Sequence, residues 1–158
     1  MTLRKPAVDP STLDAHTGTN YPEPWRSRVL PREKFSLGEA AALTKIGINR
    51  TVLGPGKESS MRHWHTHEDE FVYVLEGEVV LRTDAGEQVL LAGHCAGFPA
   101  GVREGHQFVN RSLQPAVYLE VSNRDPSDTA YYSDPDVNMV WSAPHARGRI
   151  SRRDGSDY

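Results

Sequence analysis

Four side chains that can bind a transition metal lie close together in the sequence. His63, His65 and His67 stand at alternate positions, and Glu70 follows three residues later. Imidazole nitrogens and carboxylate oxygens are ligands that divalent transition metals accept. In an extended strand, residues i, i+2 and i+4 point to the same face, so these imidazoles can face one ion. The segment therefore predicts a metal site that begins on a β-strand.

The part of the chain around these residues predicts an all-β domain. From residue 45 to residue 122, short apolar runs alternate with turn signals at 54–56, 76–78 and 84–86. Short strands separated by glycine and proline turns are typical of a β-sandwich or barrel and not of an α/β fold. The expected strands lie at 45–53, 70–75, 79–83, 88–91, 106–109 and 116–121, with one more short strand between 93 and 99.

Composition divides the chain into three parts. Residues 1–44 are polar and contain five of the prolines, which disfavour helix interiors and central strands. We expect this segment to pack on the barrel or on a partner subunit, with a short helical turn at 37–43. Residues 45–122 form the expected barrel. Residues 123–158 lose the regular pattern, apart from an expected hairpin around 137–141, so both extensions are predicted to be irregular.

Length and composition also limit the function. A chain of 158 residues fits one domain with one hydrophobic core. The net charge of -3 argues against general binding to nucleic acid or to a membrane surface. The single cysteine, Cys95, excludes an internal disulfide and is expected to be a small buried apolar residue. No apolar run approaches the length of a membrane span, and a cytoplasmic protein is expected.

Two motifs, in order, resemble those of the cupin superfamily. In the first, His63 and His65 flank one residue, four residues separate them from Glu70, and six more precede Gly77. The second motif consists of Gly93, Pro99, Gly101, His106 and Asn110. The resemblance covers about residues 45–122, and the surrounding sequence also looks like a group of small single-domain bacterial cupins that are largely uncharacterised.

The sequence departs from the cupin pattern in two places. Six residues separate Gly56 from His63, where five are usual, and four separate Gly101 from His106, where two are usual. Both additional lengths fall in predicted loops, so they change the shape of a loop more than the arrangement of ligands.

The resemblance implies a double-stranded β-helix, or jelly-roll barrel, that encloses one divalent metal. The implied ligands are His63, His65, Glu70 and His106, and the ion would be Zn, Mn, Fe or Ni. His67 competes for this site, but pairing it with His65 would leave a gap to Glu70 shorter than the family has. We therefore expect His67 at the turn, either exposed or at the mouth of the site.

Strand alternation predicts which neighbouring side chains face the site. If Glu70 points inward, Val72 and Val74 also point inward, whereas Phe71, Tyr73 and Leu75 lie on the other face. By the same rule Phe108 shares the inner face with His106. His94 is expected on the surface, and Asn110 is expected to fix a turn.

A metal with three imidazoles and one carboxylate retains one or two open positions when it is five- or six-coordinate. Such a site permits Lewis-acid chemistry, activation of water, or oxygen chemistry with iron. We expect a metal-dependent small-molecule enzyme, and the resemblance allows an oxygenase, an isomerase or a decarboxylase. Candidates for an acid or base, by proximity to the motifs alone, are Glu58, Arg62, Arg103, Glu104 and Tyr118.

Two alternatives to an enzyme remain open. The protein can be a non-catalytic module that binds a sugar or a carboxylate, or a structural cupin without a metal. No segment resembles a helix-turn-helix, so a self-contained transcription regulator is not expected. Unpaired strand edges and the long N-terminal segment predict a homodimer, because exposed edges need to be covered.

Overall fold

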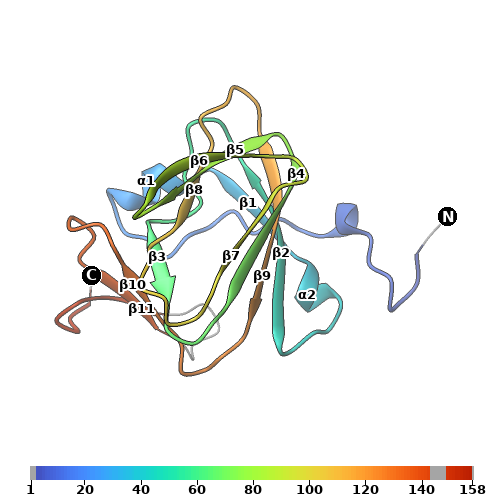
Figure 1. The fold of residues 1–158 in the computed structure, drawn as a ribbon. Coiled ribbons are helices and arrows are strands. Elements are labelled where there is room, and N and C mark those ends of the chain that lie inside the picture. Colours follow the sequence, from blue (N-terminus) through green and yellow to red (C-terminus); the bar gives the residue numbers. More distant parts are fainter. Residues whose placement is uncertain (1–2, 143–148, 158) are drawn as a thin grey trace.

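Strands are the main regular elements of the computed structural model, which describes residues 3–142 and 149–157 (Figure 1). Helical segments are short: η1 (Pro10–Thr12), α1 (Trp25–Val29) and α2 (Leu37–Ala40). The strands are β1 (Arg32–Ser36), β2 (Ile46–Leu53), β3 (His63–His65), β4 (Glu70–Glu76), β5 (Glu78–Thr83), β6 (Gly86–Leu91), β7 (Cys95–Phe98), β8 (Gln107–Val109), β9 (Ala116–Asn123), β10 (Thr129–Tyr132), β11 (Met139–Ser142) and β12 (Arg149–Arg152).

The strands form three antiparallel sheets. A five-stranded sheet has the order β1-β2-β9-β4-β7, a three-stranded sheet the order β6-β5-β8, and a four-stranded sheet the order β12-β11-β10-β3. In Figure 1 the three-stranded sheet lies across the top of the view, and β2 and β9 run down its right side. This arrangement confirms the predicted all-β jelly roll, because the sheets face one another around a common interior.

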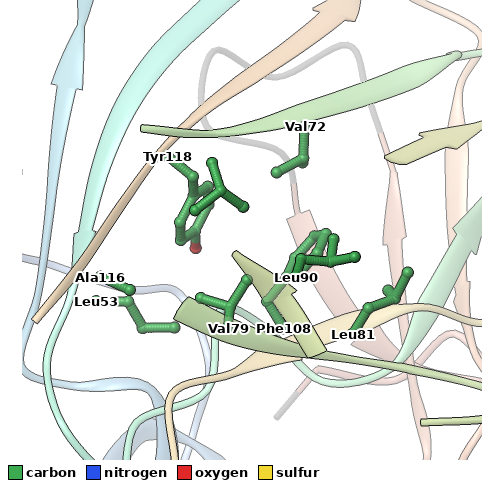
Figure 2. Close-up of a cluster of buried hydrophobic side chains, with 9 residues drawn as sticks. Leu53, Val72, Val79, Leu81, Leu90, Phe108, Ala116 and Tyr118 are labelled. Atoms are coloured by element: carbon green, nitrogen blue, oxygen red, sulfur yellow. The ribbon is translucent and has the colours of Figure 1, made fainter. Parts of the chain in front are cut away.

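A hydrophobic core fills the space between the five-stranded and three-stranded sheets (Figure 2). Figure 2 shows Val72 and Tyr118 pointing from one sheet toward Val79 and Phe108 of the other. The members of this core are Leu53, Val72, Val74, Val79, Leu81, Leu90, Phe108, Ala116 and Tyr118.

The side chains of β4 alternate as predicted. Val72 and Val74 are buried, whereas Phe71, Tyr73 and Leu75 are 42%, 39% and 38% exposed. The outer face of β4 is therefore apolar as well as accessible, and it offers a surface for the expected homodimer contact. The homodimer itself stays a prediction.

The two extensions are more regular than the sequence indicated. β1 pairs with β2 along its whole length, and β10 joins β3 to β11 and β12. The sequence of β1, Arg-Glu-Lys-Phe-Ser, carries little β-propensity and is a strand because β2 offers an edge to pair with. The expected helical turn at 37–43 is the short helix α2. Residues 1–2, 143–148 and 158, which belong to these extensions, lie outside the described residues.

A second hydrophobic cluster fastens both extensions to the barrel. Val29 of the N-terminal segment packs there with Met61, and with Tyr132, Val137 and Met139 of the C-terminal segment. All five are at most 5% exposed. The extensions are thus part of the packed structure around β3.

The expectation for Cys95 was wrong. Its side chain is exposed, because Cys95 begins β7, which is the edge strand of the five-stranded sheet, and the side chain lines a cavity. Among the described residues, no helix is long and apolar enough to cross a membrane.

Two glycines with the same backbone conformation provide a test of the turn that leads from β4 in one sheet to β5 in the other. Gly77 and Gly56 have φ angles of +73° and +72°. A Cβ atom on Gly77 would lie 3.0 Å from the carbonyl oxygen of Pro115, whereas one on Gly56 would meet nothing within 4 Å. We expect Gly56→Ala to lower the free energy of unfolding by about 1 kcal/mol, and Gly77→Ala by roughly 2 to 3 kcal/mol, since the clash adds to the backbone strain.

Urea denaturation of both variants beside the wild type measures this difference. Equal losses of stability would contradict the close approach of Pro115 to Gly77.

Candidate metal centre

Two strands and the residue before a third bring the predicted ligands together. His63 and His65 are the two ends of β3, Glu70 is the first residue of β4, and His106 immediately precedes β8. The backbones of His63 and His106 form an antiparallel bridge, with N–H···O distances of 3.1 and 2.8 Å. This bridge holds the two halves of the site in register, although 43 positions separate them in the sequence.

The three imidazoles converge on one oxygen of the Glu70 carboxylate. Glu70 Oε2 lies 2.7 Å from His106 Nε2, 3.5 Å from His65 Nε2 and 3.8 Å from His63 Nε2. Ligand atoms of His63, Glu70 and His106 all lie within 4.8 Å of one another. Three imidazole nitrogens that aim at one carboxylate form a donor set of the kind that a divalent transition metal accepts.

Contacts at the other ring nitrogens orient two of the imidazoles. His63 Nδ1 lies 2.9 Å from the carbonyl oxygen of Met61, which can only accept, so Nδ1 donates and Nε2 is left unprotonated. His65 Nδ1 lies 2.6 Å from Asp128 Oδ2. Both Nε2 atoms are thereby set up as ligands.

Asp128 is a buried carboxylate that the sequence analysis missed. It is 1% exposed, and it also accepts hydrogen bonds from the backbone N–H groups of His67 (2.8 Å) and Glu68 (3.3 Å). Asp128 lies beyond the two motifs, and only the pairing of β3 with β10 brings it to His65. Spacing along the chain carried no signal for it.

The ring of His106 is held by stacking. Phe98 lies parallel to it, with ring centroids 3.7 Å apart and an angle of 8° between the planes. The His106 side chain is 5% exposed, and its Nδ1 is buried with no hydrogen-bond partner among the described residues. Its Nε2 is therefore the nitrogen that faces the other candidate ligands.

Burial and the neighbouring charges set the protonation states of the site. Burial by itself would raise the pKa of Glu70, but the hydrogen bond from His106 and the nearby His65 and His63 hold that pKa well below its ordinary value. Burial, together with His106, lowers the pKa of His63 to about 3. Glu70 is thus an anion and His63 a neutral imidazole at neutral pH, which are the forms that bind a metal.

The pair formed by His65 and Asp128 behaves differently. Burial would lower the pKa of His65, but the hydrogen bond to Asp128 raises it above its ordinary value. Burial would raise the pKa of Asp128, but the hydrogen bond with His65 and the two backbone N–H groups bring it to about 2. Asp128 is therefore a fixed negative charge beside the candidate ligands.

Other candidates from the sequence lie outside this convergence. His67 is exposed and contacts the hydroxyl of Thr66, and His94 is also exposed. Asp69, the carboxylate that precedes Glu70 in the sequence, also lies outside it and accepts a hydrogen bond from the backbone of Ala100. Asn110 fixes a turn as expected, since its amide donates to the carbonyl oxygens of Leu53 and Gln114, and its Oδ1 accepts from Ser112.

Most of the acid or base candidates are held in other contacts. Glu58 pairs with Arg28, Arg62 pairs with Asp84 and Asp134, and Arg103 lies over the ring of Trp64. The ring of Tyr118 belongs to the hydrophobic core. Of these candidates only Glu104 lines a cavity at the site.

Two cavities meet at the candidate metal centre. One has a volume of about 410 Å³ and the other about 860 Å³, and both are lined by His65, Glu68 and Glu70. His106 lines the smaller cavity and His63 the larger one. Glu68 was also missed by the sequence analysis, because it lies in the loop between β3 and β4, where strand alternation does not apply.

The low pKa of His63 predicts a pH dependence for the metal-free protein. The unfolded chain binds a proton at His63 below about pH 6.5, whereas the folded protein does so only near pH 3. The free energy of unfolding should therefore fall as pH decreases from 6 to 4, with His63 contributing up to about 1.4 kcal/mol per pH unit. Denaturation with a chelator present, at several pH values, should give a shallower slope for His63→Gln than for the wild type.

His94→Gln, which removes an exposed histidine, is the matched control and should keep the wild-type slope. A His63→Gln slope equal to that of the wild type would contradict a buried neutral His63.

Known proteins share both the fold and the sequence. A sequence model of the cupin domain matches residues 49–122. A crystal structure from Silicibacter pomeroyi, described as a sugar phosphate isomerase from a cupin superfamily, is 41% identical with a TM-score of 0.90, over 97% of this chain and 96% of that chain. No curated protein matches the chain significantly.

Two further structures are similar at lower identity. A protein of Acidithiobacillus ferrooxidans, provisionally described as a sugar phosphate isomerase, is 28% identical with a TM-score of 0.69, over 78% of this chain and 77% of that chain. The polyketide cyclase RemF of Streptomyces resistomycificus is 21% identical with a TM-score of 0.65, over 86% and 89% of the two chains, and shares the fold alone. With a matching domain model and a relative 41% identical over nearly the whole of both chains, this protein belongs to the cupin superfamily.

Proposed function

We propose that this cupin is a metal-dependent isomerase that acts on a sugar or a sugar phosphate. The observation that carries the proposal is the convergence of three imidazoles on the Glu70 carboxylate, at the junction of two cavities. The similarity to the Silicibacter pomeroyi protein, described as a sugar phosphate isomerase, supports this reaction class.

The donor set fits a divalent transition metal. His63, His65, Glu70 and His106 would hold the ion, and Zn, Mn, Fe and Ni all accept imidazole and carboxylate ligands. Nε2 of His63 is already unprotonated, because its Nδ1 contacts the Met61 carbonyl oxygen, and the contact of His65 Nδ1 with Asp128 turns Nε2 of His65 toward the other ligands. When bound, the metal would supply Lewis-acid polarisation of a substrate oxygen.

Isomerisation of a sugar also needs a group that moves a proton between neighbouring carbon atoms. Glu68 is the best placed carboxylate, since it lines both cavities beside His65 and Glu70. Its Oε1 accepts a hydrogen bond from the backbone of Asp125 at 3.0 Å, which fixes the direction of the carboxylate. We assign the proton transfer to Glu68 and metal binding to the four converging ligands.

The test is to measure metal content and isomerisation on the same preparations. The full chain should contain about one divalent metal and should interconvert an aldose phosphate and its ketose phosphate, followed by ¹H NMR across a panel of sugars. A chelator should abolish the conversion and addition of metal should restore it. His106→Ala should lose the metal, whereas Glu68→Gln should keep it and lose the conversion by roughly 100-fold or more.

Other results would contradict the proposal in distinguishable ways. Full metal content with sugar binding but no conversion would indicate a non-catalytic binding module. A protein that binds no divalent metal under any loading condition would be a metal-free structural cupin.

Asp128 should tune the affinity for the metal through His65. We expect Asp128→Asn to weaken metal binding about 10- to 100-fold, because the carboxylate orients His65 and increases its basicity. Competition with a coloured chelator measures the affinity. Asp69→Asn, which changes an exposed carboxylate next to Glu70 in sequence, is the control and should change the affinity less than about twofold; equal effects of the two variants would contradict the assigned role of Asp128.

A further inference from the structure

The two cavities at the candidate metal centre differ in charge. The smaller cavity is lined by the carboxylates Glu68, Glu70 and Glu104, and no lysine or arginine in the described part of the chain lines it. The larger cavity is lined by Arg32, Lys34 and Arg124 in addition to its own carboxylates. Among the described residues, cationic side chains that can bind a negatively charged group of a substrate therefore line the larger cavity and not the smaller one.

Two of the three cations in the larger cavity are already neutralised. Lys34 Nζ lies 2.6 Å from Glu120 Oε2, and Arg124 Nη2 lies 3.6 Å from Glu39 Oε1. Arg32, by contrast, forms no ion pair with any carboxylate of the described residues. It is the cation whose charge the structure leaves unbalanced.

Arg32 is also buried. It is 9% exposed, its Nη1 donates to the carbonyl oxygen of Ser59, and its Nε is buried with no hydrogen-bond partner among the described residues. A buried charge is costly unless it is paired, and one neutral carbonyl does not balance a guanidinium. The unbalanced charge and the unused N–H donor of Arg32 together point to an anionic ligand, which would supply both a negative charge and a hydrogen-bond acceptor.

A series of short contacts connects Arg32 to the candidate metal ligands. Arg32 contacts Ser59, Ser59 Oγ lies 3.3 Å from Ser60 Oγ, and Ser60 Oγ lies 3.3 Å from His63 Nδ1. Arg32, His63 and Glu70 line the same cavity of about 860 Å³, a size within the usual range for small-molecule sites. One ligand can therefore reach both the guanidinium and the metal centre.

Tyr21 adds a second donor to the same cavity. Its hydroxyl oxygen accepts hydrogen bonds from the backbone N–H of Met61 (3.3 Å) and from the hydroxyl of Tyr132 (3.2 Å). No acceptor for the proton of Tyr21 itself occurs among the hydrogen bonds of the described residues, and Tyr21 lines the cavity. That proton is available to a ligand oxygen.

We propose that the larger cavity binds a phosphorylated substrate, with Arg32 and Tyr21 as the residues that bind its phosphate. Guanidinium groups suit this role because their planar donors match the oxygens of a phosphate. The proposed isomerase function assigns the other end of this substrate to the metal centre. The phosphate site itself requires only Arg32, Tyr21 and the cavity.

The test is a titration of the metal-free full chain with inorganic phosphate, by calorimetry at fixed ionic strength. Arg32→Gln should weaken phosphate binding about tenfold or more, because it removes a charge-assisted hydrogen bond. Arg50→Gln is the matched control: Arg50 lies over the ring of Phe35 and lines neither cavity, so the affinity should stay within about twofold of the wild type. Tyr21→Phe should weaken binding by a smaller factor, about threefold.

Equal affinities for the wild type and Arg32→Gln would overturn the proposal, as would an equal loss in Arg32→Gln and Arg50→Gln. If Arg32→Gln does not fold, Arg32→Met, which removes the charge but keeps a long side chain, provides the measurement, and an unchanged affinity in that variant would likewise overturn it. If phosphate binding depends on Arg32 but the protein isomerises no sugar, the proposed function would be contradicted and the phosphate site would still be supported. If the protein isomerises sugars but its phosphate binding does not depend on Arg32, the proposed function would be supported and the phosphate site would be contradicted.

Discussion

The close approach of three histidines to the Glu70 carboxylate is the interaction around which the interior of this protein is arranged. An ionised carboxylate in a barrel interior is stable only where donors or cations lie beside it, and here the His106 imidazole is the hydrogen-bond partner of Glu70, with His65 and His63 within 3.8 Å. The backbone bridge between His63 and His106 holds these side chains close to Glu70. The strands β3 and β4 and the start of β8 are fixed in relation to one another by it.

Residues from several parts of the chain contact the candidate ligands or place charges near them. Asp128 anchors His65 from the side of the C-terminal strands, and Phe98 covers the ring of His106 from β7. On the N-terminal side, Arg32 places in the larger cavity a positive charge that no carboxylate of the described residues pairs with. The two extensions therefore contribute charged groups to the centre as well as covering the barrel.

Much of the site was predictable from the sequence, because its signal is local. His63, His65 and Glu70 lie within eight residues of the sequence. Strand alternation predicted that Val72 and Val74 are buried. The prediction for Cys95 rested on residue type alone and was wrong, since residue type does not say which strand lies at the edge of a sheet.

The sequence by itself predicted the fold class and the side of β4 that faces inward, because turn signals and strand alternation are local, and its resemblance to the two cupin motifs supplied the four candidate ligands. Only the tertiary structure decided the role of Asp128, which reaches His65 through the pairing of β10 with β3. It alone also placed Arg32 in a cavity with His63, through the pairing of β1 with β2. Contacts between residues tens of positions apart depend on which strands pair, and the local pattern of polar and apolar residues does not encode that choice.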